Sequence, residues 1–264
     1  MTERRQAGLA LAPLVLLELG AFVWPLAVLA RHGEVARLAL PVTDPVVRGC
    51  VLTSYGLSLA VAVVAVGLAI PAGWALARSR APAARLVLSL PLLFSGVMVG
   101  FLGVLVLGNV GALPALSQRL TGTRWGEGLA YTPAGLFLAY LWFELPRAVL
   151  ALEAAFRELD PDLEAAAASL GAGPWARFRR VVLPGVWPAI RETVAAAFAI
   201  ALGSYGAALI LTRRTTVLPV AIYEQFTGFL DDATACALCA WLVVPALVAG
   251  ALSGGLLPRA RKAE

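Results

Sequence analysis

The sequence predicts an all-α, polytopic membrane protein with six transmembrane helices and a charged loop on the cytoplasmic side. Hydrophobic residues make up 60% of the 264 residues and charged residues 14%, a balance that is too apolar for a soluble domain. Apolar stretches of about 20 residues, the length that crosses a hydrocarbon core as a helix, occur six times. Basic residues are also unevenly divided between alternate loops. We therefore expect residues 1–264 to form one transmembrane domain.

The first three expected spans carry few polar groups. The first follows Arg4 and Arg5 and, at about 24 residues, exceeds a signal-peptide core of about 7 to 15, so we expect a retained anchor. Glu18, near its centre, either contacts a partner helix or stays protonated or snorkels. Gly96 and Gly100 in the third span have the spacing that lets helices pack closely. The six spans are expected at residues 7–30, 54–77, 86–110, 131–150, 189–211 and 233–257.

The last three spans contain polar residues of different kinds. In the fourth, Glu144 and Arg147 lie three residues apart, which favours a local ion pair. The fifth is interrupted by Gly-Ser-Tyr-Gly at residues 203–206. The glycines weaken the helix, and the hydroxyls of Ser204 and Tyr205 need hydrogen bonds that lipid cannot supply. We expect these two side chains to face the bundle interior. The Cys-x-x-Cys of the sixth span has no second pair and no nearby histidine, so we interpret it as small apolar residues.

The orientation follows from the basic residues. If the amino terminus is cytoplasmic, fourteen Arg and Lys residues lie inside and seven outside, which places both termini in the cytoplasm. The net charge of +5 is then explained by topology and does not indicate a nucleic-acid partner. The seven outside residues are Arg31, Arg37, Arg48, Arg119, Arg124, Arg213 and Arg214.

The most informative segment is the cytoplasmic loop at residues 160–184. Asp160 can cap a helix, Pro161 suits its first position, and Gly171 suits the left-handed residue just past its end. A second short helix can begin at Pro174, carry a run of arginines and stop before Pro184. The sequence therefore predicts two short helices hinged at residues 171–173.

The spacing of this loop resembles the signature of type I ATP-binding-cassette importer permeases, E-A-A-x3-G-x9-I-x-L-P. Counted from Gly171, the E-A-A positions fall on Ala165, Ala166 and Ala167, and the I-x-L-P positions on Val181, Leu183 and Pro184. The signature glutamate is replaced by Ala165, and Glu164 lies one residue earlier, about 100° around the helix. The resemblance is strongest over residues 131–257.

The resemblance implies a fold, a function and a set of partners. It implies a multi-pass permease of the bacterial inner membrane that is coupled through residues 160–184 to separate ATPase subunits. The other partners that it implies are a second permease subunit, an extracytoplasmic solute-binding protein and the surrounding lipid. In the family the fifth span lines the translocation path, so Ser204 and Tyr205 are candidates for it. The segment at residues 217–224 and the acidic pair Asp231 and Asp232 resemble the polyamine, ferric-iron, thiamine and oxyanion branches; a polyamine-like solute is the first expectation.

Several kinds of chemistry are excluded. The only lysine, Lys262, has no glycine-rich run ahead of it, so the chain has no phosphate-binding loop and we do not expect an enzyme. With His32 as the one histidine, we expect no catalytic residues, no metal site and no cofactor. The alternative is a self-sufficient channel or secondary transporter, which commonly shows inverted repeats or intramembrane charges; no convincing repeat is found between the two halves.

Overall fold

The computed structural model describes residues 35–79, 81–212 and 216–254, with isolated positions before residue 35. The expected span 7–30, with Glu18, lies outside the described residues apart from those positions. Within the described ranges the chain is helical and has no strand, which confirms the all-α class. Five apolar helical stretches are long enough to cross a membrane: Pro45–Arg78, Gly96–Thr121, Pro133–Arg157, Pro174–Leu202 and Asp232–Ser253. The count of six spans therefore stays a prediction.

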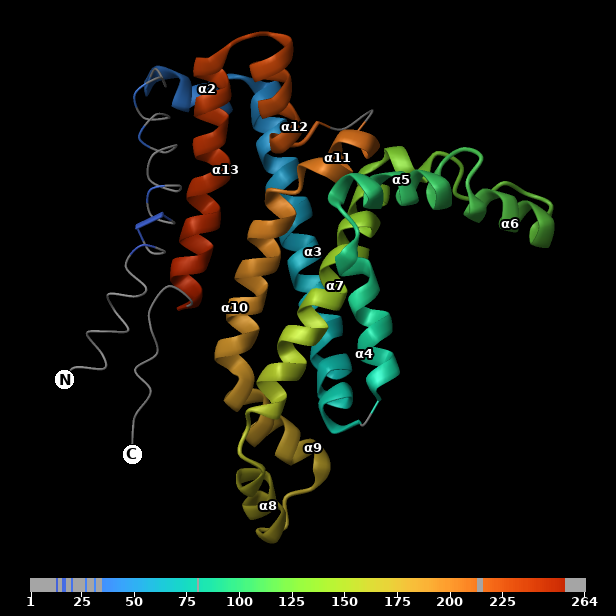
Figure 1. The fold of residues 1–264 in the computed structure, drawn as a ribbon, viewed down its shortest axis with the longest axis vertical. Coiled ribbons are helices and arrows are strands. Elements are labelled where there is room, and N and C mark those ends of the chain that lie inside the picture. The colour runs from blue at the N-terminus through green and yellow to red at the C-terminus, as the bar shows by residue number, and fades with distance from the viewer. Residues whose placement is uncertain are drawn as a thin grey trace.

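Four long helices form the bundle in Figure 1: α3 (Pro45–Arg78), α7 (Pro133–Arg157), α10 (Leu183–Leu202) and α13 (Asp232–Ser253). Short elements η1 (Val35–Ala39) and α2 (Leu40–Thr43) lead into α3, and α12 (Leu218–Tyr223) with η5 (Glu224–Gly228) leads into α13. The helices α8 (Pro161–Ser169) and α9 (Pro174–Arg177) project beyond one end of the bundle. At the other end, α5 (Gly96–Leu107) and α6 (Ala112–Thr121) extend sideways, and η3 (Leu129–Tyr131) returns to α7.

The most extensive contact between two helices of the bundle joins α3 to α7. A Cβ at Gly73 would lie 3.1 Å from the backbone nitrogen of Glu153 and 3.2 Å from the carbonyl oxygen of Val149. Small residues on α3, including Ala65 and Ala69, are fully buried. Because small side chains let backbones approach, the two helices touch along the half of α3 nearest to α8.

Arg85 joins three helices at the same end of the bundle. It lies on α4 (Pro82–Ser89), and its guanidinium donates to the carbonyl oxygens of Leu76 (3.2 Å) and Ser79 (3.1 Å), which satisfies carbonyls at the end of α3. Its Nε also donates to Glu153 of α7 at 2.6 Å, and Arg157 Nε lies 3.0 Å from the same oxygen. The buried carboxylate therefore has two cationic partners.

The expected span 86–110 is not one continuous helix. The apolar run begins in α4, tightens to a 3-10 turn at η2 (Leu90–Leu93), becomes extended at Phe94, and restarts as α5 in another direction. Pro91 removes a backbone donor, and the side chain of Ser95 accepts from the backbone of Met98 at 3.4 Å as the N-cap of α5. Pro91 and the Ser95 cap are local signals of this turn, but neither predicts the direction in which α5 restarts.

Candidate functional site

The helix α8 is closed at both ends by its own residues. At its start, the Asp160 carboxylate accepts from the backbone nitrogen of Asp162 at 2.9 Å. At its end, Gly171 has φ of +83°, and its nitrogen donates to the oxygen of Ala168 at 3.0 Å. The next nitrogen, of Ala172, donates to the oxygen of Ala167 at 3.1 Å, which completes a Schellman motif. The capping residues thus have the roles that the sequence indicated.

The second half of the loop differs from the prediction. The helix that begins at Pro174 does not stop before Pro184 but continues through a π-helical turn, η4 (Phe178–Val182), directly into α10. The nitrogen of Leu183 donates to the oxygen of Phe178, five residues back. This wider turn precedes Pro184, whose ring would clash with the carbonyl of Arg180 in a regular α-helix. The loop is therefore one free helix, α8, followed by the first turns of a membrane helix.

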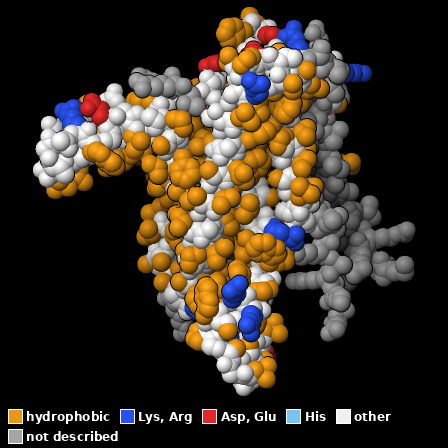
Figure 2. Space-filling model, turned by 180° about the vertical axis from the view of Figure 1, so that it is seen from behind, with side chains coloured by type: hydrophobic (Ala, Val, Ile, Leu, Met, Phe, Trp, Pro, Cys, Tyr) orange, Lys and Arg blue, Asp and Glu red, His pale blue; other side chains and the backbone are white. Residues whose placement is uncertain are grey.

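Most of α8 and α9 is accessible. None of the residues of α8 is buried, and most of its apolar side chains are exposed: Ala165, Ala166 and Ala168 lie open, and Leu170 just past its end is 88% exposed. Trp175 on α9 is 71% exposed. Figure 2 shows hydrophobic side chains over the middle of the bundle and charged ones toward its two ends. The exposed alanines and leucine make the tip of the molecule a surface that could enter an apolar cleft.

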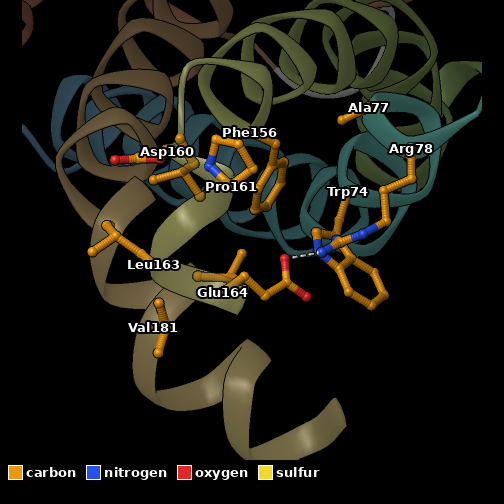
Figure 3. A pocket seen from close by; sticks show the side chains of 12 residues that line it. Trp74, Ala77, Arg78, Phe156, Asp160, Pro161, Leu163, Glu164 and Val181 are labelled. Carbon is orange, nitrogen blue, oxygen red and sulfur yellow. Dashed lines mark hydrogen bonds and ion pairs between the residues drawn. The ribbon is translucent and has the colours of Figure 1, made fainter. Parts of the chain in front are cut away.

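Glu164 turns back toward the bundle. Its carboxylate forms an ion pair with Arg78, the last residue of α3, and Figure 3 shows the side chain pointing from α8 to Arg78 and Trp74. The Arg78 guanidinium lies over the Trp74 ring, 4.2 Å from its centroid. Trp74 in turn meets Phe178 edge to face at 5.0 Å, and Phe178 stacks with Trp175 at 5.8 Å. A continuous row of side chains thus runs from α8 to α3 and back to α9.

The other sequence-predicted residues of the loop lie on different sides of it. Val181 is half-buried and lines a cavity of about 230 Å³ between α8, α7 and the end of α3, whereas Ala167 and Leu183 are half-buried elsewhere and Pro184 is exposed. Val182, which the signature leaves free, is more deeply buried than Val181 or Leu183. At Gly185 an added Cβ would lie 2.7 Å from the side chain of Leu159, so this glycine lets α10 pass close to the end of α7.

The second candidate region is the interruption at residues 203–206. The helix α10 ends at Leu202, and α11 (Tyr205–Leu211) begins after a break at Gly203 and Ser204. Tyr140 of α7 donates its hydroxyl to the carbonyl oxygen of Ser204 at 2.7 Å, so the break has a buried donor. The rings of Tyr205 and Tyr223 lie 5.2 Å apart. Ser204 and Tyr205 are both half-buried, at the boundary between the bundle and its surface.

Glycines bring α11 against α5. An added Cβ on Gly206 would lie 2.7 Å from the backbone nitrogen of Val97, and one on Gly100 would lie 2.9 Å from Ile210 Cβ. The spacing of Gly96 and Gly100 thus serves close packing, as expected from the sequence. The interruption in the fifth span therefore creates a short helix that crosses α5 at backbone distance.

A cavity with a few charged residues in its lining lies between α7 and α10. It has a volume of about 290 Å³ and is lined by alanines of both helices together with Glu144, Arg147, Glu192 and Thr193. The carboxylate of Glu144 is buried and accepts from Arg147 at 3.3 Å, which confirms the predicted local ion pair. The guanidinium of Arg147 also lies 4.5 Å from the centroid of the Phe143 ring. Among the described residues, no group of three or more His, Cys, Asp or Glu side chains could hold a metal ion.

Sequence reasoning missed the partners of the candidate residues. In the sequence Arg78 contributes only to the charge distribution, and no pattern points to Trp74 or Tyr140. Arg78 is 86 residues from Glu164, and Tyr140 is 64 residues from Ser204. The available signal was an aromatic or basic side chain inside a span or at its end, which does not identify a partner on another helix.

Residues 63–262 match the family described as binding-protein-dependent transport system inner membrane component. The chain is 31% identical over 233 residues to the molybdenum transport system permease protein ModB of Mycobacterium tuberculosis, covering 86% of each chain. It is 32% identical over 203 residues to ModB of Escherichia coli, covering 73% of this chain and 87% of that protein. With the sulfate transport system permease protein CysW of Synechocystis it shares 29% identity over 186 residues, 67% of this chain and 66% of that one.

Solved structures show the same fold at lower identity. A bacterial alginate ABC transporter, crystallised with an alginate pentasaccharide-bound periplasmic protein, contains a chain that superposes with a TM-score of 0.75 at 18% identity, covering 97% of this chain and 98% of that one. The MetNI methionine ABC transporter, in inward-facing conformations, gives a TM-score of 0.58 at 15% identity, covering 83% of this chain and 99% of that one. At such identities the likeness concerns the fold alone.

Proposed function

Because the chain belongs to the family of binding-protein-dependent transport system inner membrane components, we propose that it is the permease subunit of an ATP-driven importer for an oxyanion of the molybdate or sulfate class. The observation that carries the solute class is the similarity to molybdenum permeases over most of both chains. The polyamine-like solute that the sequence placed first is replaced, since the relatives reported above are named for molybdenum and sulfate. Oxyanions were among the other candidates.

The exposed tip formed by α8 and α9 supports the proposed coupling to a separate ATPase. A rigid short helix with its apolar side chains open to solvent can be held in a cleft of a soluble subunit, and it then moves as a body. The chain leaves α8 toward α7 on one side and toward α10 on the other. A displacement of α8 therefore acts on two helices of the bundle, which is the connection a transport cycle requires.

The same proposal assigns partners to the other surfaces. The end of the bundle that carries α5, α6 and the turn before α13 would face the solute-binding protein, and a second permease subunit would complete the path beside α10 and α11. Ser204 and Tyr205, at the break between these two helices, are the proposed path residues. Both termini and α8 would be cytoplasmic, as the distribution of basic residues favours, and lipid would surround the apolar middle of the bundle.

Reconstitution tests this function. In liposomes, the purified chain with its ATPase subunit, the second permease where one exists, and a binding protein loaded with molybdate or sulfate should take up that anion and hydrolyse ATP. The purified chain alone should do neither, because it has no phosphate-binding loop. Binding protein presented with spermidine is the matched control for the solute class.

Three results would contradict parts of the proposal. Uptake of spermidine but not of either anion would reject the oxyanion class. Absence of coupled ATP hydrolysis in the complete complex would reject the importer function. Steady, selective flux through the chain by itself would favour the self-sufficient channel or secondary transporter.

A further inference from the structure

We propose that Glu164, Arg78 and Trp74 form a brace that fixes the angle of α8 to the bundle, so that force on α8 reaches α3 as well as its neighbours in the chain. This inference rests on the proposed importer function. In the brace, Arg78 and Glu164 are positioning residues that act through contacts inside the chain. Glu164 lies one residue before the glutamate position of the family signature. Its side chain would then point toward α3, where its partner Arg78 lies.

The first step is that α8 is joined to the bundle by bends on both sides. Between α7 and α8 the chain turns at residues 158–160, and between α8 and α9 it turns at residues 170–173, where Gly171 is left-handed. No residue of α8 is buried. A helix joined by two such bends can swivel without moving the spans, unless side chains hold it.

The second step is that the space beside α8 is incompletely filled. The cavity of about 230 Å³ separates parts of α8 from Phe156, Leu159 and Val182. Apolar packing on this side is therefore loose, and the ion pair of Glu164 with Arg78 crosses the edge of the cavity. A polar contact thus holds α8 at a place where a close-packed interface is missing.

The third step is that Arg78 is itself joined to the bundle. It ends α3, its guanidinium lies over the Trp74 ring, and the Trp74 ring is held by Phe178. The backbone of α3 around Gly73 touches α7. The carboxylate of Glu164 therefore contacts a residue that belongs to the closely packed pair α3 and α7, and a push on α8 is passed to this pair.

The far part of α3 extends the effect to the other side of the molecule. The Ser54 hydroxyl accepts from the backbone nitrogen of Leu218 at 2.8 Å, at the start of α12. From Ser54 to Arg78 the helix is about 36 Å long at 1.5 Å per residue. One helix thus contacts α8 at one end of the bundle and the α12 turn toward the opposite end.

The test is a charge exchange in the complete transporter. Arg78→Glu and Glu164→Lys should each lower molybdate uptake per ATP hydrolysed by about fivefold or more, the lower range of allosteric coupling. The double variant Arg78→Glu/Glu164→Lys should recover part of the coupling, because the ion pair is restored with reversed charges whereas the cation–π contact of residue 78 with Trp74 is lost. Glu158→Lys, an exposed glutamate outside the loop, gives the same change in charge and should behave like the wild type.

A distance measurement separates the brace from a loss of assembly. Spin labels on Ala75 of α3 and Ala168 of α8, both exposed, should give one narrow distance distribution in the wild type and the double variant, and a broad one in each single variant. Co-purification of the ATPase subunit is measured in parallel. A coupling defect in Glu164→Lys together with normal coupling in Arg78→Glu would show that Glu164 contacts the ATPase, and would overturn the brace.

The inference and the proposed function fail in different ways. If the wild-type complex transports molybdate but both single variants keep its coupling and a narrow distance distribution, the brace is rejected and the importer stands. If the wild-type complex transports no oxyanion, the importer proposal fails, whereas the distance distributions still decide whether the ion pair holds α8. Failure of the double variant to recover would likewise reject the pairing.

Discussion

Tyr140 donates its hydroxyl to the carbonyl oxygen of Ser204 at 2.7 Å, and this bond joins the middle of α7 to the break between α10 and α11. A break in a helix leaves backbone groups without intrahelical partners, and in an apolar surrounding such groups need another partner. The buried phenol therefore allows the fifth span to change direction at this position.

We expect Tyr140→Phe to lower the stability of the chain in detergent by about 1 kcal/mol, because the carbonyl of Ser204 loses its donor. Ser204→Ala is the matched control: the bond uses the backbone carbonyl, so this variant should keep the wild-type melting temperature. If Ser204 lines the translocation path, Ser204→Ala should lower solute uptake while its melting temperature stays at the wild-type value. Equal melting temperatures for Tyr140→Phe and the wild type would show that the hydrogen bond does not support the break.

Gly171→Val should uncouple the transporter while leaving it in the membrane. At φ of +83° a side chain costs about 1 kcal/mol or more, and a β-branched one distorts the turn that ends α8. Gly173 has open space and a φ of −66°, so Gly173→Ala should be tolerated. The measurement is the stimulation of ATP hydrolysis by the loaded binding protein; full stimulation and uptake in a stably expressed Gly171→Val protein would contradict the role of this cap.

Gly206→Ala should destabilise the crossing of α5 and α11 by about 1–3 kcal/mol, the usual cost of overpacking. The added methyl group would meet the backbone nitrogen of Val97 at 2.7 Å, and backbone cannot rotate away as a side chain can. Gly203→Ala, three residues earlier, meets only the oxygen of Ala199 at 3.5 Å and serves as the control. Thermal unfolding in detergent compares the two, and a Gly206→Ala protein as stable as the control would show that α5 and α11 can separate easily.

Thiol labelling in intact cells should place α6 outside and η4, which follows α9, inside. The free cysteines Cys50, Cys236 and Cys239 are first replaced, and single cysteines are then introduced at Arg119 on α6 or at the exposed Arg179 of η4. An impermeant maleimide should modify the first and reach the second only after the cells are opened. Labelling of the Arg179→Cys protein in intact cells would reverse the proposed orientation.

The sequence predicted features that depend on a few neighbouring residues. Asp160, Pro161 and Gly171 act on backbone groups within five residues of themselves, so their roles as caps follow from local chemistry. The interruption at residues 203–206 is predictable for the same reason, because two glycines and a serine weaken a helix wherever it is packed.

Features that depend on packing were not predicted. The end assigned before Pro184 was wrong, because a π-helical turn accommodates the proline and lets the helix continue. The direction in which the chain leaves the turn at Phe94 was not predictable, since it brings α5 against α11, which is more than 100 residues further along the chain. The partner of Glu164 was also not predictable, since pairing with Arg78 requires the end of α3 to lie beside α8.

The local caps of α8 have a consequence for how such a chain can evolve. Both ends of this helix are closed by bonds among residues 160–172, so its shape does not depend on which side chains its outer surface carries. If α8 enters a partner's cleft as proposed, substitutions at Ala165, Ala166 or Ala168 would follow changes in that cleft without altering the caps. The contact of this segment with an ATPase subunit and the contacts of the membrane helices with a solute would then be free to change independently of each other.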